Sequence, residues 1–172
     1  RSGHFDAVLL VSSCDKAVPA HLMAAARLDL PAVHVPGGSM AAGKGDVTVD
    51  QIGAIAAKMR RGELTVAEYR EWADNAVPSC GACAFMGTAL TSQVMSEVLG
   101  LAPPGSAVLP AAGDRLEQVA REAAGLLLAH LAAGRTARDL MTPAAFRNAM
   151  VVHAAIGGST NFLLHLPAIA GE

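Results

Sequence analysis

The chain has 172 residues, of which 52% are hydrophobic and 16% charged, with 13 Lys and Arg against 15 Asp and Glu. This length allows one domain with a buried core. The near-neutral charge gives neither the basic footprint of a nucleic-acid-binding protein nor a polybasic membrane patch, and no apolar stretch approaches the roughly 20 residues of a membrane-spanning helix. We therefore expect no nucleic-acid partner and no membrane association.

The first predicted element is a strand over residues 6–12, indicated by an apolar run that leads into Cys14, Asp15 and Lys16. In open α/β sheets, ligands bind where strands pass into loops. Thiolate suits iron or zinc and carboxylate suits magnesium, so two metal-binding chemistries lie side by side here. A surface ion pair between Asp15 and Lys16, of little energetic value, is the plain alternative.

A helix over residues 17–28 and a second strand over 31–36 follow, and a glycine pair stops that strand. Backbone N–H groups of the glycine-rich loop after it are able to bind a carboxylate or phosphate, but a plain turn explains the loop equally well. Apolar periodicity then predicts helices over 49–60 and 65–75. The second of these begins with the capping-box residues Thr65 and Glu68.

Cys80 and Cys83 form a C-x-x-C pair ahead of a helix predicted over 84–99. A helix N-terminus at Cys83 would favour the thiolate form. The pair alone is shared by thiol redox proteins and zinc sites. Cys14 is the only other cysteine, which leaves one ligand fewer than the usual four of a cluster. Buried, inert thiols are the plain alternative for Cys14 and Cys80.

The remaining predicted elements are a short strand and three helices, over residues 106–109, 114–133, 142–156 and 159–170. A second glycine-rich segment, 157–161, separates the last two helices and again allows either a bound anion or a plain N-cap. The whole pattern predicts a single α/β domain over residues 1–172, in which helices outnumber strands.

The three cysteines suggest no disulfide framework and predict reduced thiols in a cytoplasmic protein. Residues 1–4 lead directly into a strand pattern, so we expect no signal peptide. The chain does not begin with Met and ends directly after a helical pattern, which suggests a piece of a longer protein. The high apolar content suggests that another domain or subunit covers part of the surface, although an Ala-rich sequence explains it equally well.

Taken together, these segments resemble the dihydroxy-acid and sugar-acid dehydratase family, which includes phosphogluconate dehydratase. The matching segments occur in the family's order: Cys14-Asp15-Lys16, Pro36-Gly37-Gly38-Ser39-Met40, Pro78-Ser79-Cys80-Gly81-Ala82-Cys83, Glu97-Val98-Leu99-Gly100-Leu101 and Gly157-Gly158-Ser159-Thr160-Asn161. Within the family, residues 83–89 and 150–155 most resemble xylonate-type aldonate dehydratases. Members of the amino-acid pathway usually have Thr-Ala-Asn where this chain has Thr88-Ala89-Leu90, which argues against a dihydroxy-acid substrate without excluding it.

The resemblance implies a dehydratase that uses an iron–sulfur cluster, [2Fe–2S] or [4Fe–4S], and Mg²⁺ to convert a xylonate-like sugar acid to its 2-keto-3-deoxy acid. The alternative is the dihydroxy-acid dehydratase of branched-chain amino-acid biosynthesis. The chain would be the N-terminal domain of a larger two-domain enzyme, with a short, mostly parallel sheet flanked by helices. An upstream segment and a C-terminal β-rich domain would complete it, and the whole protein would be a homodimer or homotetramer.

The resemblance also assigns roles to residues. Cys14 and Cys83 would be two of three thiolate ligands of the cluster, and the third would lie upstream of Arg1. Asp15 and Lys16, the latter carbamylated, would bind Mg²⁺, and Lys16 is the expected catalytic residue of this chain. The substrate pocket would be bordered by Gly158, Ser159, Thr160 and Asn161. Because the family's serine base lies in the C-terminal domain, we expect the chain to be inactive alone.

Two other functions stay open. A thiol–disulfide oxidoreductase would use Cys80 and Cys83 as its redox pair and needs a strand before them and a helix after them. The sequence predicts the helix but no preceding strand. A non-catalytic domain with a structural metal is the second alternative, and it would leave Lys16 without a role.

Overall fold

The computed structural model describes residues 4–172. The first three residues, on which the expected absence of a signal peptide partly rests, lie outside the described residues. None of the described helices is both long enough and apolar enough to cross a membrane.

A β-α-β unit forms the centre of the molecule. Strands β1 (Val8–Ser12) and β2 (Ala32–Pro36) pair in parallel, and helix α1 (Ala17–Leu28) connects them. The register places Val8 opposite Ala32 and Ser12 opposite Pro36, so both strands end at the same edge of the sheet. β2 is buried along its whole length, whereas β1 alternates between half-buried and exposed residues. The α/β class and the short parallel sheet are therefore confirmed.

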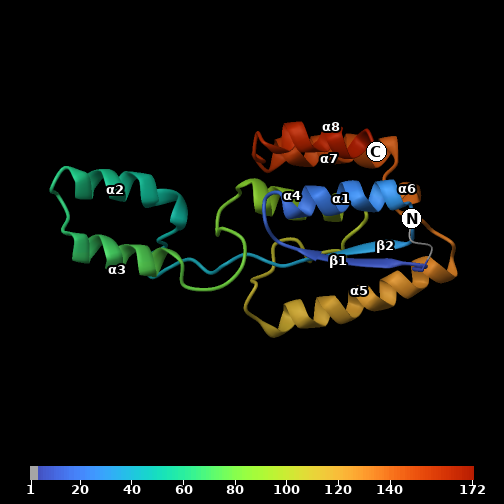
Figure 1. The fold of residues 1–172 in the computed structure, drawn as a ribbon, viewed down its shortest axis with the longest axis horizontal. Coiled ribbons are helices and arrows are strands. Elements are labelled where there is room, and N and C mark those ends of the chain that lie inside the picture. Colours follow the sequence, from blue (N-terminus) through green and yellow to red (C-terminus); the bar gives the residue numbers. More distant parts are fainter. Residues whose placement is uncertain (1–3) are drawn as a thin grey trace.

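Helices cover both faces of this sheet (Figure 1). On one face, α1 packs with α4 (Thr88–Val98) and α8 (Phe162–Ala170), and α7 (Pro143–Ala155) packs on α4. The larger core lies there, with Leu22, Met95 and Phe162 fully buried. On the other face, α5 (Asp114–Ala132) packs on β2, and Ala123 contacts Val33 and Val35 in a smaller core.

A helical hairpin extends from this body (Figure 1). It consists of the 3₁₀ turn η1 (Val49–Gln51), α2 (Ile52–Arg60) and α3 (Val66–Ala76), which pack mainly on one another. The predicted capping box is present, because the Thr65 hydroxyl accepts the Glu68 N–H at 3.2 Å and the Glu68 carboxylate accepts the Thr65 N–H at 2.7 Å.

The strand predicted over residues 106–109 is wrong. This segment forms turns, and its pairing is limited to an isolated bridge between Pro110 and Ser39. The reason is local, because the Glu97 carboxylate accepts the N–H groups of Gly105 at 2.7 Å and Ala107 at 3.0 Å. Backbone groups bonded to a side chain cannot also join a sheet ladder.

The helix predicted from residue 84 begins later, at Thr88. Its N-cap, Gly87, has extended backbone, and residues 84–87 form bends. Cys83 therefore does not lie at a helix N-terminus, and the argument that the helix dipole favours its thiolate does not apply. The short helix α6 (Ala137–Leu140) was not predicted.

Candidate functional site

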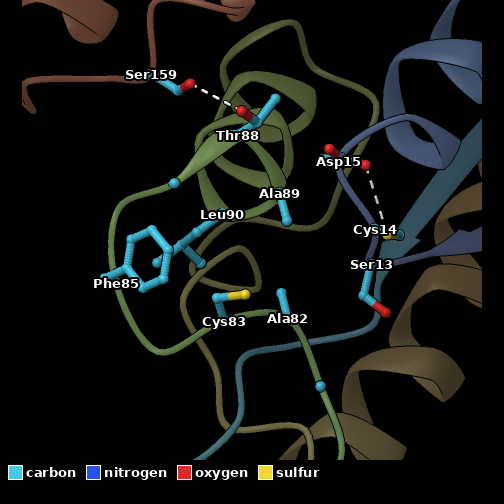
Figure 2. Close-up of a pocket in the computed structure, with 12 residues that line it drawn as sticks. Ser13, Cys14, Asp15, Ala82, Cys83, Phe85, Thr88, Ala89, Leu90 and Ser159 are labelled. Carbon is cyan, nitrogen blue, oxygen red and sulfur yellow. Dashed lines mark hydrogen bonds between the residues drawn. The ribbon is translucent and has the colours of Figure 1, made fainter. Parts of the chain in front are cut away.

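A cavity of about 530 Å³ opens where the end of β1 faces the loop before α4. Figure 2 shows its lining, with Cys14 and Asp15 on one side and Cys83 and Phe85 on the other. The full lining is Ser13, Cys14, Asp15, Gly81, Ala82, Cys83, Phe85, Gly87, Thr88, Ala89, Leu90 and Ser159. The cavity lies beyond the carboxyl ends of the parallel strands, where α/β proteins bind ligands.

The two cysteines that the sequence singles out as ligands both line this cavity. Cys14 is exposed and Cys83 is half-buried, and neither forms a disulfide. The Cys14 thiol donates a weak hydrogen bond to the Asp15 carboxylate at 3.6 Å. Two thiols and a carboxylate thus reach one space from segments that are far apart in the sequence.

Lys16 lies at the edge of this arrangement. Its ammonium is 3.7 Å from the Asp15 carboxylate, and its side chain is 88% exposed. It is not among the residues that line the cavity. In this conformation Asp15 and Lys16 form a surface ion pair of small energetic value.

The end of β1 is anchored by a chain of hydrogen bonds whose direction can be deduced. Ser96 donates its hydroxyl proton to the Gln93 backbone carbonyl at 2.8 Å, so it accepts a proton from Nδ1 of His34 at 2.9 Å. Nε2 of His34 is then an acceptor and receives the hydroxyl proton of Ser12 at 2.9 Å, while Nδ1 of His21 donates to Ser12 at 3.0 Å.

This chain of bonds requires a neutral imidazole at His34. The side chain is fully buried, and that burial, with the neighbouring charge of His21, lowers the pKa of His34 to about 4. A protonated ring would carry donors on both nitrogens and could no longer accept from Ser12. Ser12 lies two residues before Cys14, so the network fixes the strand end from which the Cys14 loop begins.

The Cys83 loop is attached to the segment that follows β2. The Gly38 carbonyl accepts the Ala82 N–H at 2.9 Å, and the Ala82 carbonyl accepts the Met40 N–H at 2.7 Å. The same segment bonds to residues 109–111 through Ser39. The glycine-rich loop after β2 therefore uses its N–H groups within the protein, as the plain-turn alternative predicts.

Of the four residues predicted to border a substrate pocket, Ser159 lines the cavity. Its hydroxyl lies 2.8 Å from that of Thr88, which also lines the cavity (Figure 2). The Ser159 N–H donates to the Thr91 hydroxyl at 3.0 Å. The remaining three do not line the cavity: Gly158, Thr160 and Asn161. Gly158 is half-buried against the His153 ring, where a Cβ would lie 2.5 Å from Cδ2, and the other two are exposed.

Cys80 is exposed and does not line the cavity. It lies in the loop between α3 and α4, so a helix and not a strand precedes it. The strand–loop–helix arrangement that a thiol–disulfide oxidoreductase needs is therefore not formed around Cys80 and Cys83. Among residues 4–172, no three His, Cys, Asp or Glu side chains cluster closely enough to bind a metal ion.

Sequence reasoning missed the residues behind the cavity. His34 and Ser12 were placed only in predicted strands, and Gln93 only in a predicted helix. His34 is a polar residue within an apolar run, between Val33 and Val35, which is the one signal that points to it. The hydrogen-bond partners of these three side chains lie 9 to 80 residues away along the chain, so a local spacing pattern does not reveal them.

A family model described as "Dihydroxy-acid/6-phosphogluconate dehydratase N-terminal" matches residues 1–172. The chain is 41% identical over 171 residues to a dihydroxy-acid dehydratase from Nitratidesulfovibrio vulgaris, and 43% identical over 171 residues to one from Moorella thermoacetica. It is 40% identical to another from Caldanaerobacter subterraneus. These matches cover 98% of the chain but 31% of each relative. They do not support the closer resemblance to xylonate-type enzymes.

Proposed function

The chain belongs to the dihydroxy-acid/6-phosphogluconate dehydratase N-terminal family, and on this premise we propose that it contributes the metal-binding part of a hydro-lyase acting on a 2,3-dihydroxy acid. One observation carries the proposal: Cys14 and Cys83, which come from separate loops, line one cavity beside the Asp15 carboxylate. The chain spans about 31% of the length of the curated relatives it matches, so the activity belongs to a longer polypeptide.

The donor set fits the expected cofactors in kind. Cys14 and Cys83 offer thiolates for iron, and the exposed position of Cys14 leaves its sulfur accessible to a metal ion from solvent. Asp15 offers a hard oxygen for Mg²⁺. Lys16 would join it only after carbamylation, which replaces the ammonium by an anionic oxygen ligand. Its amine is open to solvent and hence to dissolved CO₂.

When bound, an iron–sulfur cluster with one open iron and a Mg²⁺ ion would polarise the leaving hydroxyl and stabilise negative charge on the substrate. Cys14 and Cys83 would hold the cluster at the cavity wall. The hydroxyls of Thr88 and Ser159, which also line the cavity, would bind substrate oxygens. The base that removes the C2 proton is expected outside this chain, in the rest of the enzyme.

The substrate class is argued from the lining. Phe85, Ala89 and Leu90 present apolar surface to the cavity, which fits the alkyl end of a dihydroxy acid better than the hydroxylated chain of an aldonate. The relatives named above are called dihydroxy-acid dehydratases, which supports the same choice. An aldonate remains the second candidate, because Thr88 and Ser159 are able to bind additional hydroxyl groups.

The test compares Cys14→Ser and Cys83→Ser with Cys80→Ser in the full-length enzyme. Cys14→Ser and Cys83→Ser each remove a metal ligand. We therefore expect both to lower the bound iron and the rate of dehydration by more than the roughly 10- to 100-fold that is typical when a residue supporting a ligand is changed. Cys80→Ser, with its exposed thiol outside the cavity, should retain both. Iron analysis and 2-keto acid formation are measured with a branched alkyl dihydroxy acid and with xylonate.

Two results would contradict the proposal. If Cys14→Ser and Cys83→Ser both kept their full iron content, the metal site would lie outside this cavity. A higher kcat/KM for xylonate than for the alkyl acid would make the aldonate the substrate.

A further inference from the structure

Gln93 of α4 connects the two loops that carry the cavity cysteines. Its side chain is fully buried. Its amide oxygen accepts the N–H of Gly38 at 3.0 Å, and its amide nitrogen donates to the carbonyl of Ser13 at 3.2 Å. One side chain thus bonds to the backbone after β2 and to the backbone after β1.

The side-chain amide of Gln93 satisfies both partners. The Gly38 N–H requires an acceptor, and the Ser13 carbonyl requires a donor. An alkyl side chain provides neither, and a buried backbone group without a partner costs more than an ordinary hydrogen bond gains. The orientation of the Gln93 amide is also fixed. If the amide were reversed, its NH₂ group would face the Gly38 N–H, and its oxygen would face the Ser13 carbonyl.

Each bond of Gln93 leads to a cysteine within a few atoms. Ser13 directly precedes Cys14. On the other side, Gly38 accepts the N–H of Ala82 at 2.9 Å, and Ala82 directly precedes Cys83. One path from the Cys14 loop to the Cys83 loop therefore passes through the Gln93 amide and one backbone bridge.

The backbones along this path are packed too closely to shift independently. Gly38 has a φ of 79°, and a Cβ there would lie 2.7 Å from the backbone nitrogen of Ala111. Gly81 has a φ of 116°, and a Cβ there would lie 2.6 Å from the nitrogen of Met40. The segment after β2 and the Cys83 loop therefore form one packed unit. At its edge, the Gly37 N–H donates to the Ser12 carbonyl at 3.0 Å, and the Gln93 amide adds the bond that reaches Ser13, next to Cys14.

We propose that Gln93 is a positioning residue that fixes the separation of Cys14 and Cys83 and so prepares the two thiols to bind one cofactor. The cofactor in this inference rests on the proposed function, but the separation of the two thiols can be tested without any metal. Gln93 does not line the cavity and acts only through the two backbones that it joins.

The experiment uses the full-length protein in a Cys80→Ser background. Gln93→Met removes the amide at nearly constant length, and Gln93→Asn keeps the amide but shortens its reach by one carbon. Ser92→Ala is the control, because Ser92 is equally buried on α4 and its hydroxyl bonds within the helix, to the Thr88 carbonyl at 2.7 Å. Iron is removed with a chelator, and dibromobimane then bridges neighbouring thiols. Mass spectrometry measures how fast the Cys14–Cys83 bridge forms, and thermal unfolding is recorded for every variant.

We expect the rate of bridging to fall about tenfold or more in both Gln93 variants, because the spacing of two reacting groups acts on a rate as an effective concentration. Ser92→Ala should form the bridge at the parent rate, even if its midpoint temperature of thermal unfolding falls by as much as that of the Gln93 variants. Reconstituted iron should decrease in parallel with bridging.

Equal bridging in Gln93→Asn and Ser92→Ala, or no Cys14–Cys83 bridge in the parent, would overturn the inference. If the parent bridges but binds no iron on reconstitution, the proposed function fails, and the bridging rates still decide the role of Gln93.

Discussion

At the level of single residues, the thiols of the cavity are supported by polar side chains buried behind them. His34 links the end of β1 to α4 through Ser12 and Ser96, and Gln93 links the following loops. Each bond has a defined donor and acceptor, so each side chain is tied to one protonation or amide state. This makes His34 sensitive to pH in a direction that can be predicted.

The folded protein should lose stability in mild acid because of His34. Its pKa falls from 6.5 to about 4 on folding. Between these values the unfolded chain binds the extra proton, so the free energy of unfolding decreases as the pH falls from 6.5 towards 4. The shift corresponds to about 3 kcal/mol at most. Denaturant unfolding at pH 7 and pH 4 measures this difference.

In His34→Gln the difference between the two pH values should shrink by about that amount. The control is His4→Gln, since His4 is exposed. An unchanged pH dependence in His34→Gln would show that the ring is not held neutral by the fold.

Sequence reasoning identified the residues that line this cavity better than those buried behind it. The resemblance to the dehydratase family singled out Cys14, Asp15, Cys83 and Ser159, because they lie in motifs whose joint occurrence is specific. Gln93 carries no such signal, since its role depends on two backbone groups that only the folded chain brings together.

At the level of elements, the hairpin of α2 and α3 is stabilised mainly by itself. The capping box at Thr65 contributes to the stability of α3 in addition to its packing on α2. Hydrogen bonds from Thr65 lower the pKa of Glu68, which shows that the box favours the ionised carboxylate.

We expect Thr65→Ala to destabilise α3 by about 1 kcal/mol, the usual cost of losing an N-cap side chain. Because the hairpin packs mainly on itself, the loss should appear as local opening. Hydrogen exchange in Val66–Ala76 should become roughly fivefold faster, while exchange in α5 stays unchanged in the same sample. Uniform acceleration over both helices would mean that the hairpin and the body unfold together.

The elements show where local patterns suffice and where they do not. Residues 17–28 were predicted with their observed bounds, because apolar periodicity and a following turn act within the segment itself. Residues 106–109 were predicted as a strand on the same kind of pattern, but the Glu97 carboxylate binds the backbone before and within that segment. The later start of α4 at Thr88 likewise follows from a loop bonded to the segment after β2.

At the level of the whole molecule, the chain leaves apolar side chains uncovered on the helices furthest from the sheet. Val151 of α7 is 69% exposed, and Leu164 of α8 is 75% exposed. The relatives are about three times as long as this chain, which covers 31% of their length. The expectation that another domain or subunit covers part of the surface is consistent with both facts.

The central claim is that Cys14 and Cys83 bind one iron-containing cofactor at the cavity beyond β1. Its most direct test is diffraction from crystals of the full-length enzyme, recorded anaerobically on both sides of the iron absorption edge. The account predicts an anomalous peak at iron–sulfur bonding distance from the sulfurs of both Cys14 and Cys83. An iron peak bonded elsewhere, with these two sulfurs unbound, would contradict it.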